Sequence, residues 1–289
     1  MRTIVATAML CGIALTVPQP AHAWGDEAHQ IVALVAEHYL QPAVHDQVMA
    51  LLATDTDKLT RHDIASEATW ADHYRDSDFK TTKKRYNATY WWHYVYTGQP
   101  CNGRSDAPRG MNASMGPAKD CVVTKINQFA AELSEPSTTP KERLLALKFL
   151  LNLVADVSEP LRCSDNQGAA TMKVTADGFK AGTLAHYWEY EFVVRNGTDA
   201  HAVADQWIPV ITDADSRAWQ QGAVENWSEQ GFELARDHAY KKLPPPGAKG
   251  VYYLDAGYVE DASGIVALQL HKAGLRLAKI LNKALAKTS

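Results

Sequence analysis

The sequence contains few of the residues that mark several special classes of protein. It has 17 glycines and 13 prolines in 289 residues, too few for a collagen or a low-complexity chain. Its hydrophobic residues make up 46% of the chain, which is too many for an intrinsically disordered protein. The formal net charge is only −4, so the chain has no overall basic surface for duplex nucleic acid. These absences leave a globular protein of one or two domains.

Residues 1–23 have the features of a secretory signal. Arg2 supplies a positive start, residues 4–17 are apolar, and Ala21–Ala23 matches the small-x-small cleavage pattern. Neither this run nor any later one reaches the roughly 20 apolar residues of a transmembrane helix. The mature chain would begin at Trp24 with a charge of −5, because Arg2 is lost. The sequence therefore predicts an exported protein, periplasmic or secreted, with one domain at 24–289.

Cysteine is scarce, with four residues in the whole chain. Cys11 leaves with the signal. Cys101 and Cys121 flank a loop rich in Gly, Asn and Ser, and an exported protein enters a compartment where disulfides persist, so we expect these two to pair. Closing such a loop would stabilise the fold by about 3 kcal/mol. Cys163 then remains, either as a soft metal ligand or as a buried inert thiol.

Helical periodicity dominates the mature chain. The clearest helix begins at Thr139, an N-cap followed by Pro140 at the first helical position and by Glu142, which completes a capping box. A short hairpin is indicated at 171–181, where Asp177-Gly178 supplies a turn. The fold class is therefore predicted as all-α, with helices at about 27–40, 122–133, 139–156, 183–195, 223–242 and 256–286.

Several residues could bind a metal ion. Trp24 would carry a free amino group with His29 close behind, Asp72 precedes Arg75 by three residues, and His93 lies in an aromatic run. Asn152 and Asp156 share one face of a helix. Imidazoles and carboxylates suit zinc. Each residue also has an ordinary role, since such a histidine is often a hydrogen-bonded core residue and such an aspartate a helix cap.

The same segments occur together in a known family. The residues in question are Trp24-Gly25 with His29, Trp70-Ala71-Asp72 with Arg75, Trp92-His93-Tyr94-Val95, Cys121-Val122-Val123, Arg143 with 146–150, Trp227 with Ala235 and Tyr240, and 269–278. In this order and over 24–286 the chain resembles the S1/P1 zinc nucleases, which are relatives of the bacterial zinc phospholipases C.

The resemblance implies an all-α fold that holds zinc ions in a cleft and hydrolyses the phosphodiesters of single-stranded DNA and RNA, often with 3′-nucleotidase activity. One zinc site would use Trp24, His29 and Asp156. The neighbouring site would use Asp72, His93 and Asp156, with Asn152 as a weak fourth ligand. Arg75 would support Asp72 or the attacking water, and the ring of Tyr94 would stack against a base.

The chain departs from the family at several ligand positions. The family's stretch His-Phe-x-Gly-Asp-x-His-Gln-Pro-Leu-His is here residues 152–162, with Asn152 for the first histidine and Arg162 for the last. Ala185 and Glu189 stand where the third site has histidine and aspartate. We therefore expect one or two zinc ions, with the third site lost. Arg162 either places a guanidinium there, paired with Glu189 and able to bind phosphate, or points to solvent.

Three functions remain open from the sequence. The first is an exported zinc-dependent endonuclease of the single-strand type, with a reduced metal site and with nucleic acid or nucleotides as partners. The second is a catalytically impaired descendant that binds nucleotide, phosphate or another partner in the old cleft. The third is a phospholipase C-like hydrolase. The basic stretch from Lys80 to Arg85 either meets a phosphate backbone or is a solvated loop, and the oligomeric state is not readable.

Overall fold

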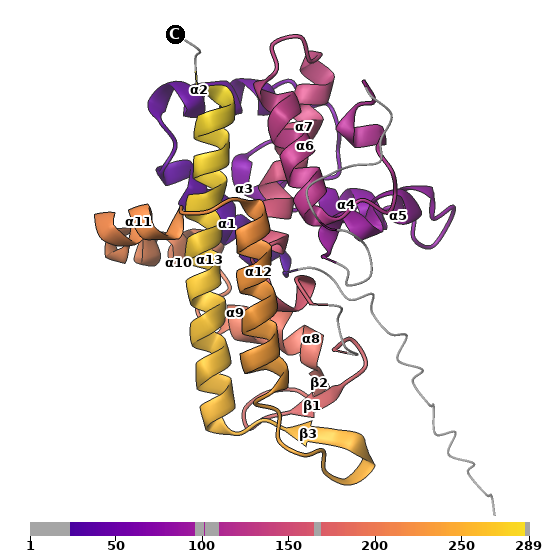
Figure 1. Ribbon diagram of the computed structural model, residues 1–289, viewed down its shortest axis with the longest axis vertical. Helices are drawn as coiled ribbons and strands as arrows, with labels where there is room; N and C mark the ends of the chain where they lie inside the picture. The colour runs from indigo at the N-terminus through magenta and orange to yellow at the C-terminus, as the bar shows by residue number, and fades with distance from the viewer. Residues whose placement is uncertain (1–23, 96–100, 102–109, 165–168, 287–289) are drawn as a thin grey trace, which may run out of the picture.

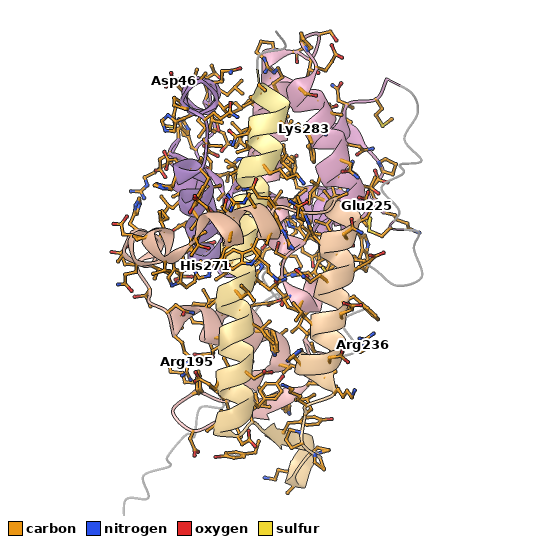
Figure 2. The ribbon with its side chains drawn as sticks, turned by 60° about the vertical axis from the view of Figure 1, so that its left-hand side comes forward. Asp46, Arg195, Glu225, Arg236, His271 and Lys283 are labelled. Carbon is orange, nitrogen blue, oxygen red and sulfur yellow. A yellow bond between two sulfur atoms is a disulfide. The ribbon has the colours of Figure 1, made fainter. Side chains whose placement is uncertain are left out.

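A long C-terminal helix organises the molecule. The computed structural model describes residues 24–95, 101, 110–164 and 169–286, so the expected signal, residues 1–23, lies outside the described residues. Helix α13 (Ala256–Leu285) runs along the length of the molecule, with α12 (Val224–Leu234) beside it (Figure 1). Figure 2 shows the same pair with Lys283 near the end of α13 and Arg236 just beyond α12.

The core lies where four helices meet. Helix α1 (Asp26–His38) packs on α13, and α6 (Val122–Ser134) packs on α7 (Pro140–Asp156). A Cβ added at Gly274 would lie 2.5 Å from the Val35 side chain, so glycine is what lets α1 and α13 approach. Helix α7 is buried from Ala146 to Asp156, and most of its charged or polar side chains there therefore need partners inside the protein.

The start of α7 confirms one half of the predicted capping box. The Thr139 side chain accepts a hydrogen bond from the Glu142 backbone N–H over 3.3 Å. The Glu142 carboxylate does not complete the box, because it accepts a hydrogen bond from the Ser114 hydroxyl over 2.6 Å. Glu142 therefore fixes the preceding loop to the helix.

Shorter elements surround this core. They are α2 (Pro42–Leu52), α3 (Ile64–Glu67), α4 (Trp70–Asp76), α5 (Lys84–Thr89), α8 (Leu184–His186), α9 (Phe192–Val194), α10 (Ala200–Trp207) and α11 (Asp213–Trp219). A π-helical turn, Tyr187–Glu191, joins α8 to α9, and a second, Ala235–Tyr240, extends α12. With these turns the helices predicted at 183–195 and 223–242 are continuous. The prediction of an all-α fold is confirmed.

The small sheet confirms the predicted hairpin and adds a strand to it. Strand β1 (Lys173–Thr175) pairs antiparallel with β2 (Gly182–Thr183), so the hairpin extends two residues beyond its predicted end. Strand β3 (Val251–Tyr253) pairs parallel with β1 from the opposite side. The sheet lies at the end of the molecule opposite α2 (Figure 1).

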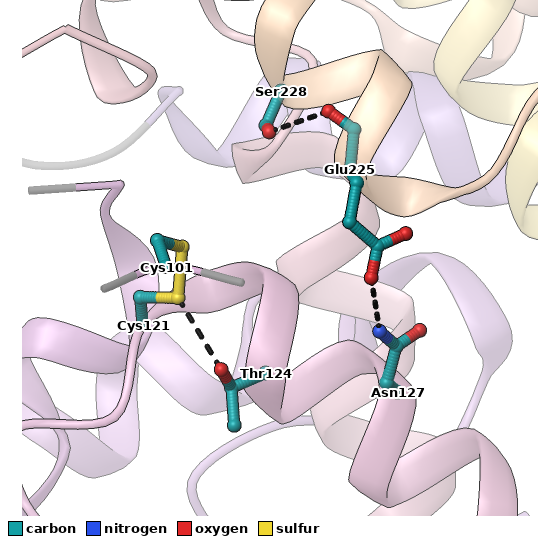
Figure 3. Close-up of a disulfide and its surroundings, with 6 residues drawn as sticks. All are labelled: Cys101, Cys121, Thr124, Asn127, Glu225 and Ser228. Carbon is teal, nitrogen blue, oxygen red and sulfur yellow. Dashed lines mark hydrogen bonds between the residues drawn. A yellow bond between two sulfur atoms is a disulfide. The ribbon is translucent and has the colours of Figure 1, made fainter. Parts of the chain in front are cut away.

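The predicted disulfide joins Cys101 and Cys121 (Figure 3). Cys121 directly precedes α6, and the Asn127 amide on α6 donates to Glu225 on α12 over 2.8 Å. Cys163 is free and buried, and its thiol donates to the Val157 carbonyl over 3.2 Å. Burial raises the pKa of the Cys163 thiol well above its ordinary value, which favours the inert form. Among the described residues no helix is long and apolar enough to cross a membrane.

Candidate functional site

Four separate segments bring the predicted metal ligands together. His29 lies on α1, Asp72 on α4, His93 at the end of the 3₁₀ turn Tyr90–His93, and Asp156 at the end of α7. The two histidines and Asp156 are fully buried, and Asp72 keeps 5% of its surface exposed. Polar side chains this deep in a core need strong partners.

The two histidines face the two carboxylates. His93 Nδ1 lies 2.7 Å from Asp156 Oδ2 and 3.8 Å from Asp72 Oδ1. His29 Nε2 lies 3.3 Å from Asp72 Oδ2 and 3.8 Å from Asp156 Oδ1. Two imidazoles and two carboxylates in mutual contact form a donor set that matches zinc in number and type.

Asn152 completes the group as a hydrogen-bond donor. Its side-chain nitrogen donates to Asp72 Oδ2 over 2.7 Å and to the Ala68 carbonyl over 2.9 Å. The same nitrogen lies 3.4 Å from His29 Nδ1. Asn152 therefore engages Asp72 through its N–H group, while its oxygen, the atom that could ligate a metal, is buried without a hydrogen-bond partner within the described structure.

Arg75 holds the other oxygen of Asp72. Its guanidinium donates to Asp72 Oδ1 over 2.6 Å and makes two further bonds to Asp76, each of 2.8 Å. Burial by itself raises the pKa of Asp72, but Arg75 together with His93 and His29 outweighs it and holds that pKa far below its usual range. Asp72 is therefore ionised and fixed in orientation at every ordinary pH.

Several buried atoms of the group lack a hydrogen-bond partner within the described structure. They are Nε2 of His29, Nε2 of His93, Oδ1 of Asn152 and Oδ1 of Asp156. Unsatisfied polar atoms in a core cost free energy, so a cluster of them indicates a group that the protein is built to bind. The nitrogen and oxygen atoms in this cluster are of the types that zinc uses, so the cluster is the candidate zinc site.

Trp24 closes one side of the group. Its indole N–H donates to the Ala155 carbonyl, beside Asp156, over 2.9 Å. The next residue, Gly25, donates its backbone N–H to the Glu189 carbonyl over 3.0 Å. These two bonds fix the predicted first residue of the mature chain against α7 and the π-helical turn.

Arg162 and Glu189 meet at the substituted third site. One Nη of Arg162 lies 3.2 Å from Glu189 Oε1, and the guanidinium carbon lies 4.1 Å from the centre of the Tyr94 ring. Arg162 is 1% exposed, and none of its three guanidinium nitrogens makes a hydrogen bond within the described structure. Burial raises the pKa of Glu189 well above its ordinary value, although Arg162 partly opposes this. Arg162 is therefore paired with Glu189 inside the protein and does not point to solvent.

Three further residues of this region, Ala185, His186 and Tyr94, are not placed to bind a metal ion or a base directly. Ala185 is buried and offers no ligand. His186 is largely exposed and lies 3.3 Å from Glu191, away from the site. The ring of Tyr94 contacts the Tyr90 ring at 5.0 Å as well as Arg162, so a base could stack on it only after one of these neighbours moved.

A second cluster, which the sequence analysis missed, lies in the segment between α2 and α4. Ligand atoms of Asp55, His62 and Glu67 lie within 4.8 Å of one another and could hold a metal ion. The Lys148 ammonium already lies there, in contact with Asp55, 3.2 Å from Glu67 and 4.2 Å from the centre of the Trp70 ring. Lys148 lies on α7, one helical turn before Asn152.

The order and spacing of these residues agree with comparisons with known proteins. The S1/P1 Nuclease family profile matches residues 24–286. The chain belongs to the S1/P1 nuclease family. Within this S1/P1 nuclease chain, the matched range begins at Trp24 and contains the whole of the group around Asp156.

Curated relatives of this S1/P1 nuclease chain are similar over nearly their whole length. Nuclease PA3 of a Penicillium species and nuclease P1 of Penicillium citrinum are each 23% identical over 279 residues, 90% of this chain and 97% of theirs. Endonuclease 2 of Arabidopsis thaliana is 23% identical over 282 residues, 91% of this chain and 90% of its own. These relatives are named as nucleases.

Proposed function

We propose that this chain is an exported, zinc-dependent phosphodiesterase of the single-strand nuclease and 3′-nucleotidase type, working with a reduced metal site. After loss of residues 1–23, a single domain at 24–289 would carry the activity. The observation that supports this most strongly is the cluster of unsatisfied buried atoms on His29, His93 and Asp156. Family membership adds that its relatives are named as nucleases.

Zinc would be held by two overlapping sets of residues. His93, Asp72 and Asp156 would form one set, with Asn152 as a weak member, and His29, Asp156 and the Trp24 amino group the other. Bound zinc lowers the pKa of water and neutralises negative charge on a phosphodiester. Asp156 would be common to both sets, as the resemblance to the family implies, and its contacts with the two histidines, at 2.7 Å and 3.8 Å, are compatible with this.

Asp72 and Arg75 would act together on the attacking side. Asp72 is ionised, and its orientation is fixed by Arg75 on one oxygen and Asn152 on the other. It also remains slightly exposed, so a substrate can approach it more readily than the fully buried histidines. Arg75 is the positioning residue of this pair, because its other bonds go to Asp76.

Arg162 would take the phosphate at the substituted third site. A guanidinium binds phosphate through two parallel hydrogen bonds, and Nε and one Nη of Arg162 have neither a hydrogen-bond nor an ion-pair partner within the described structure. Glu189 at 3.2 Å would hold the guanidinium in place. No step of hydrolysis is assigned to a third zinc, because these residues do not fit one.

A catalytically impaired binding protein is the second candidate. Asn152 favours it, because its amide donates to an oxygen of Asp72 where an imidazole would leave that oxygen for metal. A chain with weak zinc binding but an intact Arg162 would hold a nucleotide without cleaving it. The two candidates therefore differ in zinc and hydrolysis, and they share phosphate binding.

Hydrolysis of a labelled 30-nucleotide single-stranded DNA by the chain starting at Trp24 tests the proposal. We expect cleavage that falls by more than about 100-fold in Asp72→Asn, since loss of even an indirect metal contact costs 10- to 100-fold. Asp46→Asn, on the outer helix α2 (Figure 2), is the matched control and should cleave normally. Wild-type protein no more active than Asp72→Asn would contradict the enzyme proposal and leave the binding protein.

A further inference from the structure

The segment before His93 carries a dense positive charge. We call residues 79–91 the basic strap; it contains Lys80, Lys83, Lys84 and Arg85 and no acidic residue. The whole chain has a formal charge of −4, so the local charge of this segment is opposite in sign to the net charge of the protein. All four are exposed, and among the described residues none of the three lysine ammoniums has an ion-pair partner.

The basic strap is held in a defined turn by the aspartate that precedes it. The Asp78 carboxylate accepts hydrogen bonds from the Thr82 hydroxyl at 2.6 Å and from the backbone N–H groups of Arg85 at 3.0 Å and Tyr86 at 3.2 Å. Lys83 adopts a left-handed conformation with φ of 54° that closes the turn onto α5. Asp78 is thus engaged by neutral donors inside the turn and Asp76 is paired with Arg75, so neither carboxylate forms an ion pair with the strap lysines in the described structure.

A row of aromatic rings leads from the turn toward the site. Successive ring centres are 4.7 Å apart from Phe79 to Tyr86, 5.1 Å from Tyr86 to Tyr90, and 5.0 Å from Tyr90 to Tyr94. Trp91 stands edge-on to Tyr90 at 5.0 Å and is 36% exposed. The first three rings of the row are half-buried, so each offers part of its surface to solvent.

The row ends at the substituted third site. The Tyr94 ring covers the Arg162 guanidinium at 4.1 Å, and Tyr94 directly follows the predicted ligand His93. The backbone N–H of Val95 donates to the Arg162 carbonyl over 2.8 Å, which ties the end of the row to that site. A chain molecule lying on the basic strap would therefore have one end at the residues proposed for phosphodiester cleavage.

We propose that the basic strap is a binding surface for single-stranded nucleic acid that extends from the active site, with its lysines on phosphates and Tyr86, Tyr90 and Trp91 beneath bases. This inference rests on the proposed function only for the statement that the bound nucleic acid leads into the active site; binding to the basic strap does not depend on it. Unpaired bases stack on aromatic side chains whatever their sequence, whereas the bases of a duplex are stacked on one another. The combination of exposed rings with exposed cations therefore fits a single strand better than a duplex.

The test is binding of a fluorescein-labelled phosphorothioate dT20, followed by fluorescence anisotropy from 50 to 200 mM salt. The variant Lys80→Gln/Lys83→Gln/Lys84→Gln removes three cations and leaves the side-chain stems. The control Lys141→Gln/Lys241→Gln/Lys283→Gln removes three exposed cations elsewhere. We expect the strap variant to bind about tenfold more weakly at 50 mM salt, with a log–log salt slope smaller by about 2, because each phosphate contact on a single strand contributes about 0.7. The control should match the wild type.

Trp91→Ala tests the aromatic part of the surface. It should weaken dT20 binding about tenfold while the salt slope stays unchanged, since stacking carries no counterion release. A strap variant that binds dT20 like the control would overturn the proposal, as would equal affinity and slope for a 20-base-pair duplex. Cleavage of a dinucleotide, too short to reach the strap, should be the same in the strap variant and the wild type. If no form cleaves any substrate, the proposed function fails while the dT20 result still decides the strap.

Discussion

The side-chain amide of Asn152 donates a hydrogen bond to the Asp72 carboxylate over 2.7 Å, at the position where the resemblance to the S1/P1 nucleases implies a ligand histidine. One oxygen of Asp72 thus accepts a hydrogen bond from a neutral amide, and the other accepts one from the Arg75 guanidinium. An ionised carboxylate satisfied by protein donors on both oxygens has less need of a metal ion. This relationship is the physical basis on which we propose a reduced zinc site.

Asn152→His should reverse that reduction. The substitution would remove the hydrogen bond from the Asn152 amide to Asp72. It would also place an imidazole nitrogen, which can ligate zinc, beside His29 and Asp72. We expect higher zinc content and at least about tenfold faster cleavage of single-stranded DNA. Asn152→Gln, similar in size to histidine but without an imidazole, is the control. A folded histidine variant with unchanged zinc and rate would show that Asn152 does not limit the site.

Arg162→Lys should weaken phosphate binding while preserving the charge. A lysine ammonium cannot form the two parallel hydrogen bonds of a guanidinium, so calorimetric affinity for inorganic phosphate or dAMP should fall by about tenfold. Lysine also avoids the destabilisation expected if Glu189 lost its cation altogether. Arg195→Lys, at an exposed arginine (Figure 2), should leave affinity unchanged. Equal phosphate affinity in the wild type, Arg162→Lys and Arg195→Lys would show that phosphate does not bind at Arg162.

An additional residue before Trp24 should remove one set of zinc ligands. The proposed set with His29 needs a free amino group on Trp24, and a peptide bond would convert that amine to a non-ligating amide. A chain with one serine added before Trp24 should therefore bind less zinc than the chain starting at Trp24, at equal folded fraction by circular dichroism. The same zinc content in both would exclude the amino group as a ligand.

Glu67→Gln should stabilise the protein more at pH 8 than at pH 5. Burial raises the pKa of Glu67 from 4.5 to about 7 against the opposing effect of Lys148. The folded state therefore holds this proton more tightly than the unfolded chain, and stability from this group is full below pH 4.5 and is lost as the pH rises toward 7. Glutamine is neutral throughout, so the Tm difference from wild type should become more positive between pH 5 and pH 8. Glu233→Gln, at an exposed glutamate on α12, should show a Tm difference that does not change with pH.

The fold could be predicted where a local pattern determines the element. Thr139 and Pro140 mark the start of α7, and the apolar spacing of Val266, Leu270 and Leu277 gives the buried face of α13. Strand β3 could not be predicted, because its partner β1 lies some 80 residues earlier and its three residues have no alternating pattern. Helices α3 to α5 are too short for helical periodicity to show.

Site residues were found by motif, and two of their partners, Arg75 for Asp72 and Glu189 for Arg162, were predicted with them. Asp72, His93 and Asp156 belong to family segments, and the structure brings them within a few ångströms of one another. The contact of Lys148 with Asp55 joins residues 93 positions apart, so nothing local could show it. The same limit applies to Tyr94: its aromatic character is in the sequence, but the Arg162 guanidinium that covers its ring is not.

Zinc content of the purified chain starting at Trp24, measured by mass spectrometry after equilibration with excess zinc and desalting, tests the central claim most directly. The account predicts one or two ions per chain, held through His29, Asp72, His93 and Asp156, and a lower value in Asp72→Asn. Three ions per chain would show that Arg162 and Glu189 do not close the third site. No bound zinc would contradict the metal site altogether.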